Sequence, residues 1–331
     1  MMVEGSVTVV LLTTEDSPIH PIAEEILKER FRVKHITTPK PPIDEKLPGE
    51  LAEADGILVR TWDITEKVIE AAPGLKVIGI HGIGVDRVDL DAAEKRGIIV
   101  TNTPLANTMA VAEHTFGLIL SLLRRISSSD RLIREGRWKE ARSVGKLLMN
   151  MTVGIVGFGN VGTRVAKRLR AFEAKVLAYD PYVPLERFEE SGVRSVNLED
   201  LLRESDIVTL HVPLTKFTKH MIGEQELRMM RKEAFIVNTS RGSIIDENAL
   251  SLALSDGWIS GAALDVFEEE PLEQDSPLIQ LSNVVLTPHT AGSTDESLKR
   301  MAETAARDIA KVLGGEKPLH QYRRYLLPYP V

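Results

Sequence analysis

The stretch 151–181 constrains the fold most, because three glycines at fixed spacing stand between two apolar runs. Gly157, Gly159 and Gly162 follow the first run, a helical pattern comes next, and the second run ends in Asp180. In a strand–turn–helix–strand unit, the first glycine permits a tight turn, the second lets backbone approach a pyrophosphate, and the third allows close packing. An acid at the end of the second strand accepts hydrogen bonds from ribose hydroxyls and repels a 2′-phosphate. The order of these parts predicts a dinucleotide site that takes NAD rather than NADP.

Length and composition bound the class of protein. A chain of 331 residues predicts about two domains. The net charge of −7, with no basic run, argues against a nucleic-acid partner. No apolar stretch approaches the roughly 20 residues that span a bilayer, so we expect no membrane partner. The absence of cysteine excludes disulfides and thiolate metal sites and fits a cytoplasmic protein; no metal-ligand spacing occurs, so we expect no metal.

Two successive rhythms of apolar runs and helical patterns predict an α/β protein with two parallel sheets, each covered by helices. The expected strands are residues 7–12, 33–36, 56–60, 77–80 and 98–100 in the first rhythm, and 152–156, 176–179, 207–210, 235–238, 262–264 and 284–286 in the second. Between the rhythms, a helix that is apolar on most faces is expected at 108–125, buried between two domains or subunits. A polar helical arm should follow at 127–139, with Trp138 exposed or half-buried.

An amphipathic helix is also expected near the end of the chain, at 295–313, and it stops at Gly314. Its apolar face needs a partner surface, and the first rhythm lacks a covering helix for one face of its sheet. We therefore expect the chain to return to the first unit. This makes one domain discontinuous, at 1–105 plus 291–331, with the dinucleotide-binding domain at 106–290.

Three further motifs stand at the predicted carboxyl ends of strands in the second rhythm. Arg241 lies in the first, Asp265 and the acids 268–270 in the second, and His289 in the third. Because the carboxyl ends of parallel strands share the edge that holds the dinucleotide, we expect these side chains to converge there. Reduction of a 2-oxo acid requires such a set. A guanidinium grips the substrate carboxylate, a histidine supplies or removes the proton on the carbonyl oxygen, and a carboxylate fixes the imidazole.

The chain resembles the D-isomer-specific 2-hydroxyacid dehydrogenases over nearly its whole length. The matching motifs are VGIVGFGNVG, HVPLT, NTSRG, ALDVFEEEP and TPHTAG, in the order and spacing of that family. The resemblance implies two doubly wound domains, a Rossmann NAD-binding domain inserted into a flavodoxin-like substrate domain, and a homodimer. It further implies an oxidoreductase that transfers a hydride between NAD(H) and a small 2-oxo or D-2-hydroxy acid.

The resemblance also implies roles for individual residues, transferred by motif match. Arg241 is expected to bind the substrate carboxylate and carbonyl, and Glu270, five positions after Asp265, to pair with the acid/base His289. Asp265 is expected to orient the nicotinamide carboxamide, and the other two glutamates of the run to be solvated. The expected cofactor-binding set is Gly157, Gly159, Asn160, Val161, Gly162, Asp180, His211, Val212, Pro213, Thr239, Ser240, Asp265, Ala291 and Gly292. The backbone of Ile83 and Gly84 is expected to meet the substrate carboxylate. Arg60 follows a predicted strand and either reaches the substrate or forms a structural ion pair.

The choice of substrate stays open between three hypotheses. Phosphoglycerate dehydrogenases of this family tend to carry an arginine where Ile80 stands, which favours glyoxylate, hydroxypyruvate or a similar small acid here. A D-3-phosphoglycerate dehydrogenase without a regulatory domain is the alternative, since Arg60 remains. An NAD(H)-sensing corepressor-like binding protein is the alternative of another class. Five histidines are expected to have no part in the chemistry: His20, His35, His114, His220 and His320.

Overall fold

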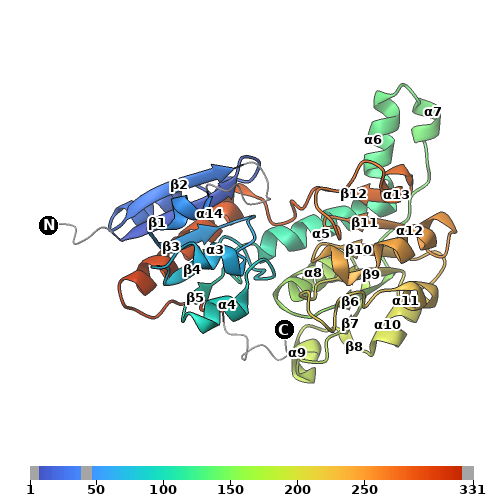
Figure 1. Cartoon of the computed structure of the whole chain (residues 1–331). Helices are drawn as coiled ribbons and strands as arrows, with labels where there is room; N and C mark the ends of the chain where they lie inside the picture. Colours follow the sequence, from blue (N-terminus) through green and yellow to red (C-terminus); the bar gives the residue numbers. More distant parts are fainter. Residues whose placement is uncertain (1–6, 39–46, 323–331) are drawn as a thin grey trace. The chain divides into compact units, whose positions relative to one another are not determined.

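Two parallel sheets organise the chain in the computed structural model, which describes residues 7–38 and 47–322 (Figure 1). The chain divides into two compact units. Unit 1 contains the described residues up to Asn107 and those from Ser293 onward, and unit 2 is Thr108–Gly292. The predicted class, an α/β protein with two parallel sheets, is confirmed.

Unit 1 is built on five parallel strands in the order β2-β1-β3-β4-β5. These are β1 (Thr8–Thr14), β2 (Arg32–Thr38), β3 (Ala54–Val59), β4 (Val77–Ile80) and β5 (Ile99–Thr101). Strands β1, β3 and β4 are mostly apolar because central strands of a covered parallel sheet are buried on both faces, whereas the edge strand β2 is largely exposed or half-buried. The helices of this unit are α1 (Ile22–Lys28), α2 (Leu47–Leu51), α3 (Glu66–Glu70), α4 (Leu90–Lys95) and α14 (Asp295–Leu313).

Helix α14 covers one face of the unit 1 sheet together with α1 (Figure 1). A capping box between Thr294 and Ser297 begins the helix, and Gly314 ends it, so its bounds are those expected from the sequence. Its apolar stripe packs on β3 and β4 so closely that a Cβ added to Gly79 would lie 2.6 Å from Ile309 Cδ1. The chain thus returns, after the whole of unit 2, to complete the first core. The opposite face of the sheet packs against α3 and α4.

Unit 2 is built on seven parallel strands in the order β12-β11-β10-β9-β6-β7-β8. These are β6 (Thr152–Val156), β7 (Lys175–Tyr179), β8 (Arg194–Ser195), β9 (Ile207–Leu210), β10 (Phe235–Asn238), β11 (Gly261–Leu264) and β12 (Val284–Leu286). The chain moves outward from β6 to β7 and β8, then crosses to β9 on the other side of β6. Ligands of such sheets bind outside the carboxyl ends of the strands, where the strand order reverses.

Helices cover both faces of the unit 2 sheet, and two further helices form the arm that projects from it. They are α5 (Thr108–Arg124), α6 (Ile126–Arg134), α7 (Trp138–Ala141), α8 (Asn160–Ala171), α9 (Leu185–Glu190), α10 (Leu198–Glu204), α11 (Glu224–Met229), α12 (Glu247–Ser255) and α13 (Pro277–Gln280). Helices α5 and α8 share a buried cluster on one face, and α10, α11 and α12 share another on the opposite face. The expected arm is two short helices rather than one, because Gly136 adopts a φ of +74° between them. Figure 1 shows α6 and α7 projecting away from the sheet of unit 2.

Candidate active site

The glycine loop after β6 has the geometry that its spacing predicts. Gly157 has a φ of +93°, and a Cβ there would lie 2.6 Å from the carbonyl oxygen of His211. A Cβ on Gly162 would lie 2.2 Å from the carbonyl oxygen of Gly157, so helix and turn could not approach so closely with a side chain. A Cβ on Gly159, by contrast, would have no neighbour within 4 Å. The loop therefore presents open backbone at the N-terminus of α8, which suits a pyrophosphate; Asn160 and Val161 form the first turn of that helix.

Asp180 lies at the rim of this loop. Its Oδ2 accepts a hydrogen bond from the backbone N–H of Phe158 at 2.9 Å, and its Oδ1 accepts one from the N–H of Tyr182 at 3.0 Å. Each carboxylate oxygen has a further lone pair, so the side chain can still accept from ribose hydroxyls. The loop and this acid together fit a dinucleotide whose ribose carries free hydroxyls.

His211, Val212 and Pro213 follow β9 against the same loop. The backbone N–H of His211 donates to the Val156 carbonyl at 2.7 Å. Its Nε2 lies 3.0 Å from Thr209 Oγ1, and burial lowers the pKa of His211 to about 3. The imidazole is therefore neutral at ordinary pH, which is the property of a structural histidine beside the site.

The loop after β10 carries Arg241. Asn238 shapes it, since its Oδ1 accepts from the Ser240 N–H at 3.1 Å and its Nδ2 donates to the Arg241 carbonyl at 2.8 Å. At the next residue, a Cβ on Gly242 would lie 1.9 Å from the carbonyl carbon of Phe267. Only glycine permits the loops after β10 and β11 to touch here. The half-buried Arg241 is thus held on the loop that adjoins the acidic run, and Thr239 is buried beside it, with its Oγ1 2.8 Å from Thr115 Oγ1.

Glu270 and His289 are in contact. His289 Nδ1 lies 2.8 Å from Glu270 Oε2, and Glu270 Oε1 accepts from the Phe267 N–H at 3.1 Å. Because a carboxylate only accepts, the shared proton belongs to Nδ1, which leaves Nε2 as the nitrogen that can exchange a proton with another molecule. The His289 side chain is 47% exposed, so that nitrogen is not sealed inside the protein.

Of the other two glutamates in the run, Glu268 makes contacts that the sequence did not predict. Glu268, expected to be solvated, accepts from the N–H of Glu247 at 3.1 Å and pairs with His220 Nε2 at 2.9 Å. Burial, followed by repulsion from the glutamates at 268–270, raises the pKa of Glu247. The Glu268 contacts tie the acidic run to the start of α12. Sequence spacing could not predict them, because the partners come from three separate loops.

Asp265 is fully buried, and its oxygens are already engaged. Oδ1 accepts from Thr287 Oγ1 at 2.6 Å and from the Thr290 N–H at 2.9 Å, and Oδ2 accepts from the Ala291 N–H at 2.8 Å. His114 Nε2 on α5 lies 3.4 Å from Oδ1. His114, expected to have no part in the site, was missed. One feature could have indicated it: it lies four residues before the buried Leu118 and so on the same helical face.

The predicted substrate residues Arg60, Ile83 and Gly84 belong to unit 1, after the carboxyl ends of β3 and β4. Arg60 donates to the Pro18 carbonyl at 2.6 Å and approaches Ser293 Oγ at 3.4 Å. Burial lowers the pKa of this guanidinium, and the charge of Asp16 opposes that shift. The Ile83 carbonyl accepts from Asn102 Nδ2 at 2.7 Å, which fixes the glycine-bearing turn.

In the part of the chain that the structure describes, no helix is both long enough and apolar enough to span a membrane. The same residues contain no cluster of three or more histidine, aspartate or glutamate side chains arranged to hold a metal ion.

Comparison with known proteins gives a consistent result. Residues 116–291 match the family described as D-isomer specific 2-hydroxyacid dehydrogenase, NAD binding domain. A glyoxylate reductase of Thermofilum pendens is 46% identical over 296 residues, which is 86% of each chain. A D-3-phosphoglycerate dehydrogenase of Methanocaldococcus jannaschii is 44% identical, over 90% of this chain and 57% of the relative. The solved D-lactate dehydrogenase of Aquifex aeolicus, complexed with NAD and lactic acid, superimposes with a TM-score of 0.81 at 34% identity and covers 93% of this chain and 96% of its own.

The chain belongs to the D-isomer-specific 2-hydroxyacid dehydrogenase family. It is an NAD-dependent oxidoreductase whose substrates are small 2-oxo and 2-hydroxy acids, as the sequence motifs predicted.

Proposed function

We propose that the protein reduces a small, unphosphorylated 2-oxo acid such as glyoxylate or hydroxypyruvate, with His289 as proton donor and Arg241 as carboxylate anchor. One observation carries the assignment of His289. Its Nδ1 is committed to Glu270 at 2.8 Å, while Nε2 stays available on a half-exposed ring. A histidine held by one nitrogen and free at the other is suited to general acid–base catalysis.

Glu270 acts on the imidazole in two ways. Its hydrogen bond fixes the ring orientation, and it keeps a proton on Nδ1, so that Nε2 is the nitrogen directed toward the substrate. The protonated Nε2 then donates to the substrate oxygen as negative charge develops there. In the oxidation direction the neutral ring accepts that proton. NAD, when bound, supplies or accepts the hydride.

Arg241 binds the other end of the substrate in this proposal. A planar guanidinium recognises a carboxylate by two parallel hydrogen bonds, which a lysine could not reproduce. The shape of its loop, held by Asn238 and by the missing side chain at Gly242, supports a fixed position for the arginine. The backbone of Ile83 and Gly84 is also proposed to bind a substrate carboxylate, and unit 1 is proposed as the substrate domain.

The cofactor would be held by the glycine loop and by the loops that end β9, β10 and β12. The open backbone at Gly159 would take the pyrophosphate, and Asp180 would accept from the ribose hydroxyls. The remaining proposed contacts come from the motif residues Asn160, Val161, His211, Val212, Pro213, Thr239, Ser240, Ala291 and Gly292. Asp265 would act mainly on the loop of His289, because its oxygens already accept four hydrogen-bonding groups.

The preference for an unphosphorylated substrate rests on Ile80, which is buried at the end of β4 where an arginine would bind a phosphate. D-3-phosphoglycerate dehydrogenation is the second candidate, supported by Arg60 and by the 44% identical relative of that name. The test is NADH oxidation with glyoxylate, hydroxypyruvate, pyruvate and 3-phosphohydroxypyruvate. We expect hydroxypyruvate or glyoxylate to exceed 3-phosphohydroxypyruvate in kcat/KM. A tenfold preference for the phosphorylated acid, about 1.4 kcal/mol in transition-state binding, would reverse the assignment.

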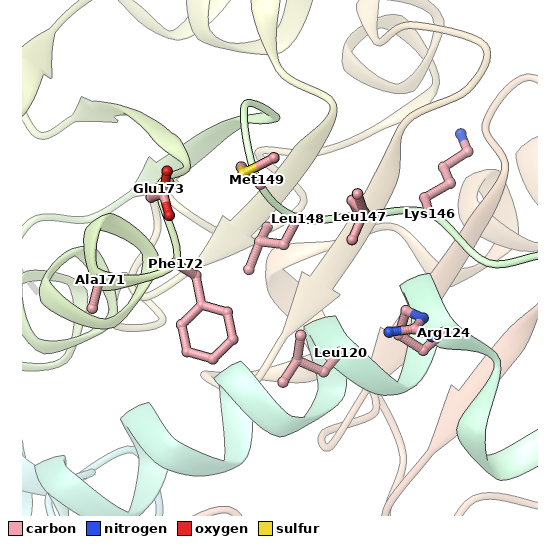
Figure 2. A pocket seen from close by; sticks show the side chains of 9 residues that line it. All are labelled: Leu120, Arg124, Lys146, Leu147, Leu148, Met149, Ala171, Phe172 and Glu173. Carbon is pink, nitrogen blue, oxygen red and sulfur yellow. The ribbon is translucent and has the colours of Figure 1, made fainter.

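We also propose that the protein is a homodimer that buries the apolar side chains of the segment 126–149. Helix α6 has no buried residue, and Trp138, Val144 and Leu147 are 64%, 93% and 68% exposed. Figure 2 shows a surface cavity beside this segment, walled by Leu120, Leu148 and Phe172. Exposed apolar groups this numerous on one segment are typical of a protein interface. The cytoplasm is the proposed compartment, supported by the absence of cysteine.

A further inference from the structure

We infer that His114 is a positioning residue for His289. Through its Nε2–H it would hold the Thr287–Asp265 pair in the arrangement that fixes the backbone of the catalytic loop. The inference rests on the proposed role of His289 as proton donor. It concerns a histidine on α5 that none of the motifs in the sequence marks.

The Asp265 carboxylate is the centre of this arrangement. Three of its hydrogen bonds come from the loop that carries His289: from Thr287 Oγ1 at 2.6 Å, from the Thr290 N–H at 2.9 Å and from the Ala291 N–H at 2.8 Å. Burial alone would raise the pKa of Asp265. Hydrogen bonds from His114, Thr287, Thr290 and Ala291 more than offset burial, so the pKa lies below its usual value and the group is a carboxylate.

Counting protons fixes the direction of the contact with His114. The Thr287 hydroxyl has one proton, and it gives that proton to the carboxylate, which can only accept. Toward His114 Nε2, 3.1 Å away, Thr287 Oγ1 must therefore accept. His114 Nε2 carries a hydrogen, whether or not the ring is charged, and the same hydrogen faces Asp265 Oδ1 at 3.4 Å.

Hydrogen bonds must fix the backbone of this loop, because His289 has an unfavourable backbone conformation. Its φ is +54°, in the left-handed region that residues other than glycine adopt at a cost. Main-chain bonds maintain it: the His289 N–H donates to the Asp265 carbonyl at 2.7 Å and to the Thr287 carbonyl at 3.1 Å. Asp265 thus accepts hydrogen bonds from the loop with both its side chain and its backbone carbonyl. Release of Thr287 would let His289 relax away from Glu270, whose oxygen it now meets at 2.8 Å.

The neighbouring residue on α5 does not compete for this role. Glu113 pairs with Arg168 of α8 at 2.9 Å. Among the described ion pairs, the one that reaches Asp265 is that of His114. A purely structural account would have His114 do no more than attach α5 to the sheet, and the two accounts differ in what a conservative substitution does.

The experiment compares His114→Gln with His114→Leu. Glutamine offers an amide N–H close to the place of Nε2, whereas leucine has the bulk without the donor. We expect kcat for 2-oxo acid reduction to fall about 10- to 100-fold in His114→Leu, as for a misplaced catalytic group. In His114→Gln it should stay within about threefold of wild type, and KM for NADH should stay within about threefold in both. Equal losses in the two variants, or a loss that falls on KM for NADH, would overturn the inference.

Thr287→Val and Thr287→Ser provide the second comparison, in case His114→Leu does not fold. Valine breaks the chain of donors while conserving shape, and serine keeps the hydroxyl, so kcat should fall in the first variant and persist in the second. His289→Ala separates this inference from the proposed function. If His289→Ala keeps full kcat, the role of His289 is wrong. If His289→Ala is impaired but both His114→Leu and Thr287→Val are normal, only the positioning role is wrong.

Discussion

The carboxylate of Asp180 accepts a hydrogen bond from the backbone N–H of Phe158 at 2.9 Å, so the acid that ends β7 is attached to the glycine loop that follows β6. The carboxylate proposed to select the ribose is therefore hydrogen-bonded to the backbone proposed to bind the pyrophosphate. A change at Asp180 acts on both, and any test of cofactor choice has to separate the two effects.

Asp180→Ala is expected to narrow the preference for NADH over NADPH, because it removes both the acceptor for ribose hydroxyls and the charge that repels a 2′-phosphate. Asp180→Asn is the matched control, since its amide oxygen can still accept from Phe158 while the charge is gone. The measurement is kcat/KM with each cofactor. Equal efficiency of the wild-type protein with NADH and NADPH would show that Asp180 does not select the cofactor.

Glu270→Leu is expected to lower kcat in both directions, because the proposed role of Glu270 is to hold Nδ1–H of His289 and so to direct Nε2 toward the substrate. Glu270→Gln is the matched variant and should keep most of the activity, since its amide oxygen can still accept from Nδ1. The measurement is kcat for reduction and for oxidation in both variants.

The control for that comparison is His289→Ala, which should depress both directions by roughly 10²–10⁴-fold, the usual contribution of general acid–base catalysis. If Glu270→Leu keeps the wild-type kcat, the carboxylate does not position His289 for catalysis.

Replacing Ile133 and Trp138 together by lysine is expected to convert a dimer into a monomer. Both side chains are exposed on the arm formed by α6 and α7, at 47% and 64%, and a charge there cannot be buried without a partner. Light scattering after size exclusion measures the molar mass. Leu185→Lys, a similar change on exposed α9, should leave the dimer intact. A wild-type protein that is already monomeric would contradict the proposed interface.

Stability should fall as pH drops below about 6.5, partly because of His81. Burial and the nearby positive charge of Arg60 lower the pKa of His81 from 6.5 to about 4, although hydrogen bonds to backbone groups, including the Leu298 carbonyl, oppose the shift. Between these values the unfolded chain binds a proton that the folded chain does not. Stability is therefore fully present above 6.5 and is lost toward 4, by about 2 kcal/mol at pH 5.

The measurement is urea unfolding at pH 7 and pH 5. His81→Gln should flatten the dependence, since an amide can still donate to the Leu298 carbonyl that His81 Nε2 contacts at 3.1 Å but cannot titrate. The same change at the exposed His35 serves as the control. An equal loss of stability between pH 7 and pH 5 in wild type and His81→Gln would assign the acid sensitivity to other groups, with His211 the next to examine.

The sequence predicted the central elements of both sheets and missed the short ones. Strands such as β6 and β9 are mostly apolar because both faces of the sheet are covered, and their predicted bounds agree with the structure. The two-residue strand β8 and the short helix α9 are too brief to show a period, so no pattern could indicate them.

In the candidate site, too, one contact could be predicted from the sequence and another could not. The contact between Glu270 and His289 could be expected from motif spacing, since each motif ends a strand at the same edge of the sheet. The contact between His114 and Asp265 could not. It joins α5, which precedes the first strand of unit 2, to the residue that follows β11, and only the packing of α5 on β11 brings them together.

The return of α14 has a consequence for synthesis on the ribosome. All five strands of the first sheet emerge before almost the whole of unit 2, yet the residues of α14 that cover Val9, Leu58 and Val77 emerge after it. At translation rates of about 5–20 residues per second, that face of the nascent sheet stays incompletely covered for roughly 10–40 s. The unit whose synthesis begins first is thus completed last, and its apolar surface is accessible to a chaperone during that interval.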